Sequence, residues 1–421
     1  FKRSAEKGTY SSYGNGGNSW YTIANYGTME INTGVTVENA GGYSSMIRNG
    51  GEATADCNLT IRGGNFTGGV NTVKNDSFGV LTINGGNFSN TAQYVIMNWN
   101  KAEITAGTFQ TLDTASAVLF TSAYGGDANT VGKLTISGGE FKHASDTQEM
   151  IVDHYDASNS GTAAVTGGKF DADISAYVPD GYILNNGTVE KLGETNAVAK
   201  VGDTYYKTLA DAVAAADNNT VTLLKDVTAD ITIPAGKTMT LDLNGKTLTN
   251  VNDHTILNNG NLTITGTGKV DNISHAKGAL YNKGTVVVNG GTFDRSKENG
   301  KTSNDSGSNS WYTIKNVGSM TIHDGATVQT AGNNTTLGKF SSLVSNGYFD
   351  ANDYSTNKGL DQPILTIDGG TFRGGLNTIK NDDRAKLTIN GGTFSNYYQA
   401  VVQNHNIAEI TGCLLYTSDA A

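Results

Sequence analysis

The string Leu-Thr-Ile-x-Gly-Gly-x-Phe returns again and again along this chain. Full copies end at Phe66, Phe88, Phe141, Phe372 and Phe394, and looser copies end at Phe109, Phe170 and Phe293. The repeats that end at Phe66, Phe88 and Phe109 are spaced by 22 and 21 residues. Apolar residues alternate inside the string and show no helical period. A repeat of this length with this alternation predicts a solenoid built from short β-strands.

One repeat shows how a turn of such a solenoid is made. Leu81 and Ile83 share one face of a strand, and Thr82 and Asn84 share the other. The glycine pair that follows predicts a corner, because glycine adopts positive φ and lets backbones approach closely. We therefore expect an all-β fold in which each turn holds two or three short strands. Stacked turns would pair each strand with its copies above and below, which is a parallel β-helix.

Two interior columns of side chains follow from this arrangement. One contains the repeated phenylalanines, with Phe1 at its start. The other lies two residues after the Ile or Val of each turn, where we expect amides that hydrogen-bond from turn to turn. His154 and Ser122 are expected to replace the amide in irregular turns. The predicted asparagine ladder consists of Asn25, Asn49, Asn75, Asn98, Asn258, Asn282, Asn316, Asn346, Asn381 and Asn404.

These features together resemble the right-handed β-helices of the pectate-lyase-like superfamily. Residues 200–216, 221–227 and 240–248 are similar to the opening segment of β-helix modules in large bacterial cell-surface, adhesin-like proteins, and residues 170–182 resemble their closing segment. The resemblance implies an extracellular or cell-surface location. It does not imply one activity, because the superfamily includes stalks, adhesins, polysaccharide lyases and glycoside hydrolases.

A long internal duplication divides the chain into two tandem arrays. The pentapeptide Ser-Trp-Tyr-Thr-Ile occurs at 19–23 and 310–314, and residues 71–76 match residues 377–382. We expect a first array over 1–187, a bridging segment over 188–206 and a second array over 207–412. Apolar residues with helical spacing predict a capping helix at about 208–217, which would cover the open end of the second array. They are Leu209, Ala212, Val213 and Ala216.

The repeat breaks after Gly412, where Cys-Leu-Leu-Tyr-Thr-Ser-Asp-Ala-Ala follows. This peptide matches the translation of a sequencing-library adapter, and Phe1 stands in the middle of a repeat. We interpret the chain as a metagenomic fragment in which both arrays are truncated and 413–421 derive from the adapter. This interpretation predicts that 413–421 do not continue the phenylalanine and glycine columns.

Composition excludes several classes of function. The net charge of −10 and the isoelectric point near 5.1 disfavour nucleic-acid binding. Cys413 lies in the suspect tail, which leaves Cys57 without a disulfide partner or a metal-binding spacing. We therefore expect no cofactor, no metal, no membrane contact by this fragment and a monomer.

A catalytic β-helix would need a positioned Arg or Lys base with calcium-binding carboxylates, or two to three carboxylates on neighbouring turns. The acidic residues that could best serve such chemistry are Asp153 and Asp156 around His154, and Asp253 next to His254. For each of these groups a structural role is the simpler interpretation. No acidic run occurs in the outward column, which reads Ala24, Arg48, Lys74, Met97, Asp153, Leu257, Tyr281, Lys315, Ser345, Lys380 and Gln403.

The sequence therefore favours a non-catalytic stalk or adhesive module, with a polysaccharide lyase or glycoside hydrolase as the alternative. Ice or mineral binding by outward threonines is a third, less favoured reading. Exposed aromatic rings can stack on sugars, so a polysaccharide or host glycan is the expected partner. The candidate glycan contacts are Trp20, Trp99, Trp311, Tyr397 and Tyr398.

Overall fold

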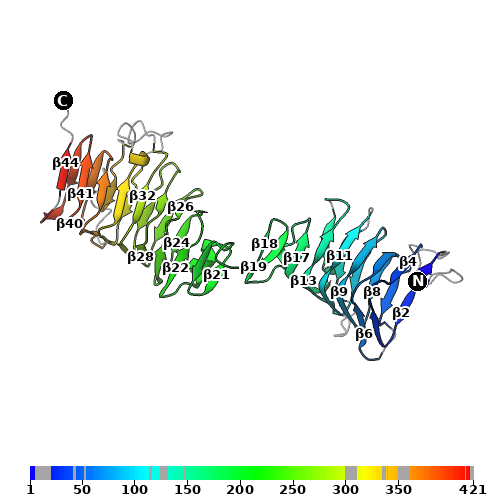
Figure 1. The fold of residues 1–421 in the computed structure, drawn as a ribbon. Coiled ribbons are helices and arrows are strands. Elements are labelled where there is room, and N and C mark those ends of the chain that lie inside the picture. Colours follow the sequence, from blue (N-terminus) through cyan, green and yellow to red (C-terminus); the bar gives the residue numbers. More distant parts are fainter. Residues whose placement is uncertain are drawn as a thin grey trace. The chain divides into compact units, whose positions relative to one another are not determined.

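The computed structural model describes two compact units, which divide between Leu192 and Gly193. In Figure 1 the first unit runs from blue to green and the second from green to red. The division lies inside the expected bridging segment. The described residues are 1–4, 20–40, 44–51, 54–112, 116–123, 131–146, 148–298, 311–333, 338, 340–348, 361–412 and 414–417.

The first unit is built from two stacks of parallel strands. The larger sheet contains β1 (Lys2–Arg3), β3 (Thr28–Ile31), β4 (Thr36–Asn39), β6 (Cys57–Ile61), β7 (Asn65–Gly68), β9 (Gly79–Asn90), β11 (Lys101–Thr111), β13 (Lys133–Lys142), β17 (Thr162–Phe170), β18 (Tyr182–Asn185) and β19 (Thr188–Lys191). The other contains β2 (Ile23–Asn25), β5 (Ile47–Asn49), β8 (Asn71–Asn75), β10 (Tyr94–Asn98), β12 (Ala117–Thr121) and β14 (Glu149–Val152). A small hairpin joins β15 (His154–Asp156) to β16 (Asn159–Ser160), and η2 spans Ser175–Tyr177.

The second unit has three sheets. Sheet 1 contains β20 (Ala199–Val201), β21 (Thr204–Tyr206), β22 (Asn219–Leu223), β25 (Thr238–Asp242), β28 (Asn261–Thr265), β31 (Thr285–Val288), β34 (Ser319–Ile322), β37 (Ile364–Ile367), β40 (Lys386–Ile389) and β43 (Ile407–Ile410). Sheet 2 contains β23 (Val227–Thr228), β26 (Thr247–Thr249), β29 (Lys269–Asp271), β32 (Gly291–Asp294), β35 (Ala326–Gln329), β38 (Thr371–Arg373), β41 (Thr393–Asn396) and β44 (Leu414–Thr417).

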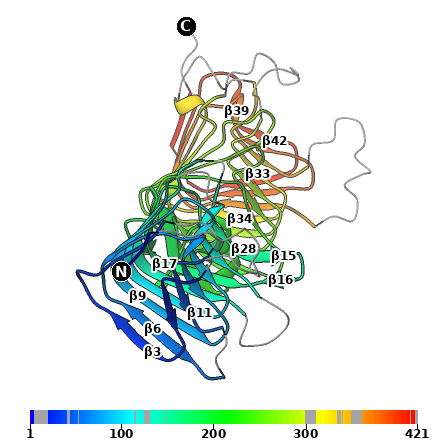
Figure 2. The same cartoon turned by 90° about the vertical axis from the view of Figure 1, so that its right-hand side faces the viewer.

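Sheet 3 contains β24 (Ile231–Ile233), β27 (Ile256–Asn258), β30 (Leu280–Asn282), β33 (Ile314–Asn316), β36 (Val344–Asn346), β39 (Asn377–Asn381) and β42 (Ala400–Asn404). Strands β33, β39 and β42 lie on the same side of this unit (Figure 2). From β22 onward each turn adds one parallel strand to each sheet. The fold is therefore all-β with parallel stacks, and it is compatible with the expected β-helix-like solenoid.

The phenylalanine column forms the core of each unit. Rings stack nearly parallel from Phe66 to Phe88 at 4.7 Å between centroids, and the same stacking continues through Phe109, Phe141 and Phe170. Phe372 and Phe394 stack at 4.7 Å in the second unit. Apart from the end residue Phe1, these rings are buried. The sequence periodicity and the packing therefore agree except at Phe1, which was expected inside the column and is exposed.

The corner explains why a glycine precedes each ring by two residues. Gly86 has a φ of 112°, and a Cβ there would lie 3.1 Å from the ring of Phe88. The ring packs over the bare backbone, so a side chain at this position would be strained and would push against its own stack. The first glycine of the pair has no positive φ, but a Cβ on Gly85 would lie 2.8 Å from the carbonyl oxygen of Arg62. Ala106 takes this place in the repeat that ends at Phe109, where the strand register shifts.

The asparagine ladder is present in both units. In the first, side-chain amides donate from Asn25 to Asn49, from Asn49 to Asn75 and from Asn75 to Asn98, over 2.7 to 2.9 Å. In the second, five such bonds of 2.7 to 2.8 Å connect Asn258, Asn282, Asn316, Asn346, Asn381 and Asn404 in order.

The expected substitutions in the ladder are wrong. Asn98 donates to the hydroxyl of Thr121 over 3.1 Å, and Thr121 pairs with Asn98 in the strand register. Ser122 is one residue further along, and His154 lies in the hairpin formed by β15 and β16. The outward column changes in the same turns. Phe120 follows Met97 in the strand register and Val152 follows Phe120, whereas the sequence predicted that Asp153 follows Met97. A turn with irregular loops cannot be placed by counting residues.

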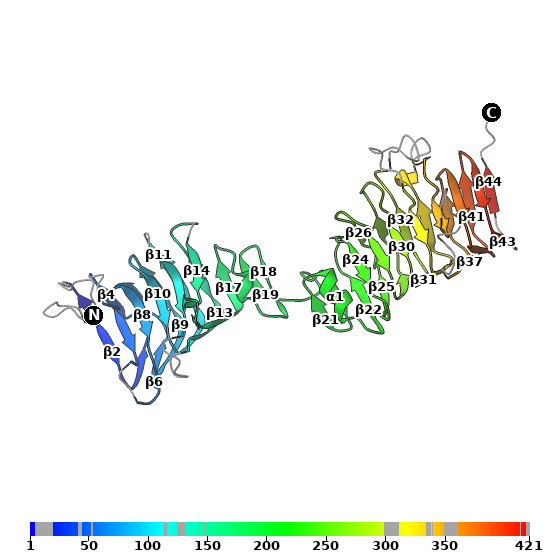
Figure 3. The same ribbon diagram turned by 180° about the vertical axis from the view of Figure 1, so that it is seen from behind.

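The capping helix is present as α1 (Leu209–Ala215), close to the predicted range. Its N-cap Thr208 accepts a hydrogen bond from the backbone N–H of Asp211 at 3.1 Å. Leu209, Ala212 and Val213 are buried, and α1 packs beside β21 and β22 (Figure 3). The helix thus contributes its apolar stripe to the core at the first turn of this unit.

Strands of the expected bridging segment belong to different units. Strand β19 pairs antiparallel with β18 and β17 at the end of the first unit, while β20 pairs antiparallel with β21 and β22 at the start of the second. Each unit therefore terminates its parallel stacking with its own antiparallel hairpin.

The described part of the tail, residues 414–417, forms a strand. The backbone of β44 pairs in parallel with β41, and Leu415 stands opposite Phe394 in the register. The backbone of these four residues continues sheet 2 with a leucine at the phenylalanine position, because a β-forming segment can pair with an open strand edge whatever its side chains. The adapter origin of 413–421 stays a prediction.

Candidate functional site

The five candidate glycan contacts do not form one surface. The side chain of Trp20 is 58% exposed and that of Tyr397 is 41% exposed, in different units, while Tyr398 is half-buried. Trp99 is only 7% exposed and packs against Phe120 and Tyr155. The expectation that Trp99 offers a ring to a ligand is therefore wrong, because the irregular turn after it folds back over the indole.

Trp311 belongs to an aromatic cluster on the outer side of sheet 3. Its ring centroid lies 4.7 Å from that of His254, 6.0 Å from that of Tyr281 and 5.3 Å from that of Tyr312. We call these four residues the aromatic cluster. They come from successive turns, since residues 254, 281 and 311–312 accompany β27, β30 and β33. Sequence reasoning placed Trp311 and Tyr281 facing outward but did not bring them together.

A buried ion pair lies next to the aromatic cluster and holds the backbone at Trp311. The side chains of Arg295 and Glu298 are 0% and 1% exposed, and the two groups contact each other. Arg295 also donates to the backbone carbonyl of Trp311 at 3.0 Å and to that of Lys277 at 2.7 Å. Burial lowers the pKa of Arg295, although Glu298 opposes this effect. No repeat periodicity points to this pair, so sequence analysis missed it.

Burial also sets the protonation of His254. Burial lowers the pKa of this imidazole to about 4, although Asp253 acts in the opposite direction. Its Nδ1 accepts a hydrogen bond from the backbone N–H of Gly278 at 2.9 Å. His254 is therefore neutral near pH 7 and acts as an acceptor within the cluster. Asp253, its neighbour, pairs instead with Lys277 at 2.7 Å.

The outward column of sheet 3 carries a polar network. Lys315 Nζ donates to Ser345 Oγ at 2.9 Å, and Ser345 Oγ donates to Asp382 Oδ2 at 3.1 Å. Lys380 Nζ lies 3.0 Å from Asp382 Oδ1, and Lys315 Nζ stands 5.0 Å from the ring centroid of Tyr312. Burial lowers the pKa of Lys315 to about 8 and raises that of Tyr312 to about 12.

The first unit repeats this arrangement with different side chains. Arg48 lies 5.2 Å from the ring centroid of Tyr21, and its Nε lies 3.1 Å from Asp76 Oδ2. Lys74 approaches the same carboxylate at 2.9 Å. Burial would raise the pKa of Asp76, but Lys74 and Arg48 outweigh it and hold the pKa below its usual value. A cation, an aspartate and a tyrosine thus recur at duplicated positions, which is typical of a structural network.

The acidic residues around His154 form a surface hairpin. His154 Nδ1 lies 2.9 Å from Asp153 Oδ1, and this hydrogen bond raises the pKa of His154. The carboxylate of Asp156 accepts hydrogen bonds from the backbone N–H of Ser158 and the amide of Asn159. Within the described parts of the chain, no group of three or more His, Cys, Asp or Glu could hold a metal ion.

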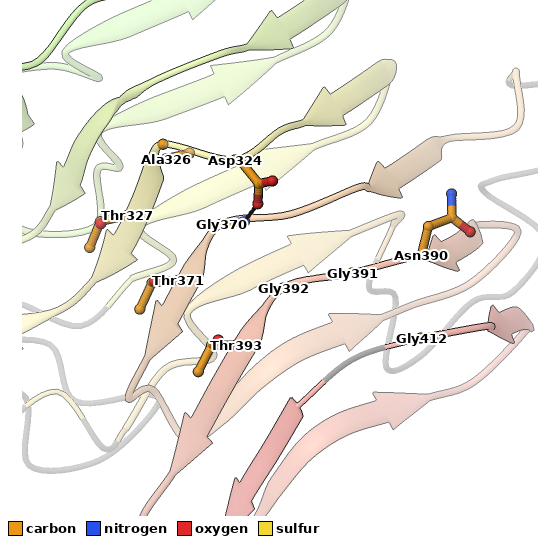
Figure 4. A pocket seen from close by; sticks show the side chains of 11 residues that line it. Asp324, Ala326, Thr327, Gly370, Thr371, Asn390, Gly391, Gly392, Thr393 and Gly412 are labelled. Atoms are coloured by element: carbon orange, nitrogen blue, oxygen red, sulfur yellow. Dashed lines mark hydrogen bonds between the residues drawn. The ribbon is translucent and has the colours of Figure 1, made fainter.

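An open groove of about 580 Å³ follows the glycine corners between sheets 1 and 2 of the second unit (Figure 4). Thr327, Thr371 and Thr393 occupy one register position on successive strands along it. Asp324 is the only carboxylate among its described lining residues, and it accepts a hydrogen bond from Gly370 N at 3.3 Å. Glycoside hydrolysis requires two carboxylates, of which the described lining supplies one, and the lining residue Asn390 donates to a further carboxylate, that of Asp368, at 2.8 Å.

The outward threonines of sheet 1 form a second column, with interruptions. Thr240, Thr263, Thr321 and Thr366 share a register position, but Val287 stands among them. After Thr388 the column continues with a glutamate at position 409. The threonine column of sheet 1 is therefore not continuous.

The chain matches no protein-family model, no curated protein and no solved structure. Within the described residues no helix is long and apolar enough to cross a membrane.

Proposed function

We propose that this chain is a non-catalytic stalk and adhesive module of a bacterial surface or secreted protein. Its two units are right-handed parallel β-helices of the pectate-lyase-like kind, and they contact polysaccharides or host glycans. The resemblance of residues 170–182 and 200–248 to module-closing and module-opening segments supports this assignment.

One observation carries the proposal: the cations of the outward column, where a β-helix lyase base was sought, belong to structural networks. Arg48 and Lys74 share the carboxylate of Asp76 in the first unit. Lys380 pairs with Asp382 in the second unit, and Lys315 is buried against Ser345. A base must reach the proton that it removes. Lys74 and Lys380 stand at equivalent positions and are paired with an aspartate in both copies, which favours a structural role over catalysis.

Two assays on the whole chain test the proposal. A glycan array measures binding, and incubation with polysaccharides measures new reducing ends and unsaturated products. We expect binding to at least one glycan class without cleavage. Cleavage products above those of a heat-denatured control would support the lyase or hydrolase instead. An absence of both binding and cleavage would remove the adhesive role and leave the stalk.

A further inference from the structure

The second unit contains a groove of about 610 Å³ that neither the repeats nor the duplication explains. Its side chains come from consecutive turns: Tyr281 from β30, Thr285 from β31, Ser319 from β34, and Tyr348 from the residues after β36. Its volume falls within the range of small-molecule sites. Tyr281 and Tyr348 are far apart in sequence, so only the stacking of turns brings them to one groove.

Glycine corners form part of its lining. A Cβ on Gly284 would lie 2.2 Å from the carbonyl oxygen of Gly260, and one on Gly318 would lie 2.1 Å from that of Gly284. Successive corners thus approach too closely for side chains. The groove keeps bare backbone here, flanked by hydroxyl-bearing and aromatic residues.

The ring of Tyr281 is held in place before any ligand arrives. It makes edge contacts with His254 at 5.1 Å and with Trp311 at 6.0 Å between centroids. Trp311 is held in turn by the hydrogen bond from buried Arg295. A ring fixed by its neighbours loses little freedom on binding, which is the advantage of a preorganised contact.

Two charged groups of opposite sign line the groove. Lys283 is exposed, and its Nζ stands 4.8 Å from the ring centroid of Tyr281. Asp361 is the acidic member, and no other charged side chain occurs among the described lining residues. Among the described lining residues these two charges balance, so they offer one donor and one acceptor without selecting a charged ligand. The net charge of −10 opposes polyanions further.

We propose that this groove binds a neutral saccharide, with Tyr281 and Tyr348 as stacking residues. Lys283, Asp361, Thr285 and Ser319 hydrogen-bond its hydroxyl groups, and the lysine moves from the ring of Tyr281 to the sugar on binding. The inference rests on the proposed adhesive function and names its ligand class and location. Of the five aromatic residues that the sequence predicted as glycan contacts, only Trp311 belongs to this proposed site, where it packs against the ring of Tyr281.

Calorimetric titration of the whole chain tests the groove, with cellohexaose, xylohexaose, mannohexaose and laminarihexaose as neutral probes and trigalacturonic acid as the acidic one. Thr285→Trp fills the groove from an exposed position. Thr238→Trp is the matched control, because Thr238 is exposed in the same column of sheet 1 but two turns away. Tyr281→Ala removes the ring, and thermal denaturation checks that each variant folds.

We expect at least one neutral probe to bind, with at least tenfold weaker affinity for Thr285→Trp and Tyr281→Ala and unchanged affinity for Thr238→Trp. If the Thr285→Trp variant still binds on the glycan array as the unsubstituted chain does, the groove is not the binding site, although the proposed adhesive function stands. Preference for trigalacturonic acid would overturn the neutral class. Failure of every probe would overturn this inference, and failure on the array as well would remove the adhesive function.

Discussion

At the scale of single residues, the ladder shows how a buried polar group is tolerated in a solenoid core. Asn316 donates to Asn346 Oδ1 at 2.7 Å and also to the backbone carbonyls of Gly318 and Ile364. The side chain is fully buried, yet its donors are paired. Removing one member leaves its neighbours with unpaired groups, which is more costly than losing one exposed hydrogen bond.

We therefore expect Asn316→Ala to lower the free energy of unfolding of the second unit by about 1–3 kcal/mol. Urea denaturation followed by circular dichroism measures the change. Asn261→Ala is the control, because Asn261 is exposed on the same unit and should change stability by less than about 0.5 kcal/mol. Equal effects of the two substitutions would contradict the structural role of the ladder.

His254 makes stability depend on pH at the same scale. The folded imidazole has a pKa of about 4, whereas the unfolded one has its ordinary value of 6.5. Between these values the unfolded state binds more protons, so stability should fall as pH decreases from 6.5 towards 4. In His254→Phe this contribution should disappear. Denaturation of both proteins between pH 4 and 6.5 measures this dependence of stability on pH, and NMR titration measures the pKa of the imidazole. A pKa near 6.5 in the folded protein would contradict the prediction.

At the scale of elements, α1 depends on its cap as well as on its apolar stripe. Thr208 accepts from the backbone N–H of Asp211, which would otherwise lack a partner within the helix. We expect Thr208→Ala to lower the free energy of unfolding by about 1 kcal/mol. Chemical denaturation measures this, and Thr208→Ser should retain most of the stability because it keeps the hydroxyl. Equal losses in both variants would show that the cap contributes little.

The regular elements were predictable from the sequence because the same residue types recur at the same positions in successive turns. The phenylalanine stack, the asparagine ladder and α1 all follow from spacing. Irregular turns were not predictable, since the shape of their loops decides whether Thr121 or Ser122 follows Asn98 in the ladder and whether Trp99 is buried. The groove at Tyr281 depends on a tyrosine from a later turn and on Arg295, and neither has a periodic signal.

At the scale of the whole molecule, the two units have separate cores. The buried apolar cluster of the first unit ends at Val189, and that of the second begins at Ala199. We expect two unfolding transitions in calorimetry. Phe141→Ala should shift one and Phe372→Ala the other, each with a loss of about 3–5 kcal/mol. A single transition that both substitutions shift would contradict separate cores.

The hydrogen bonds of the asparagine ladder all point in the same direction along the stack of turns, and this limits which side chain can occupy the ladder position of the next turn. Each of the eight hydrogen bonds between ladder amides described above runs from Nδ2 of one turn to Oδ1 of the next. Aligned amides polarise one another, so each ladder has an acceptor pole and a donor pole. Whatever side chain comes next must offer an oxygen. The hydroxyl of Thr121 meets this condition after Asn98, and a lysine would not.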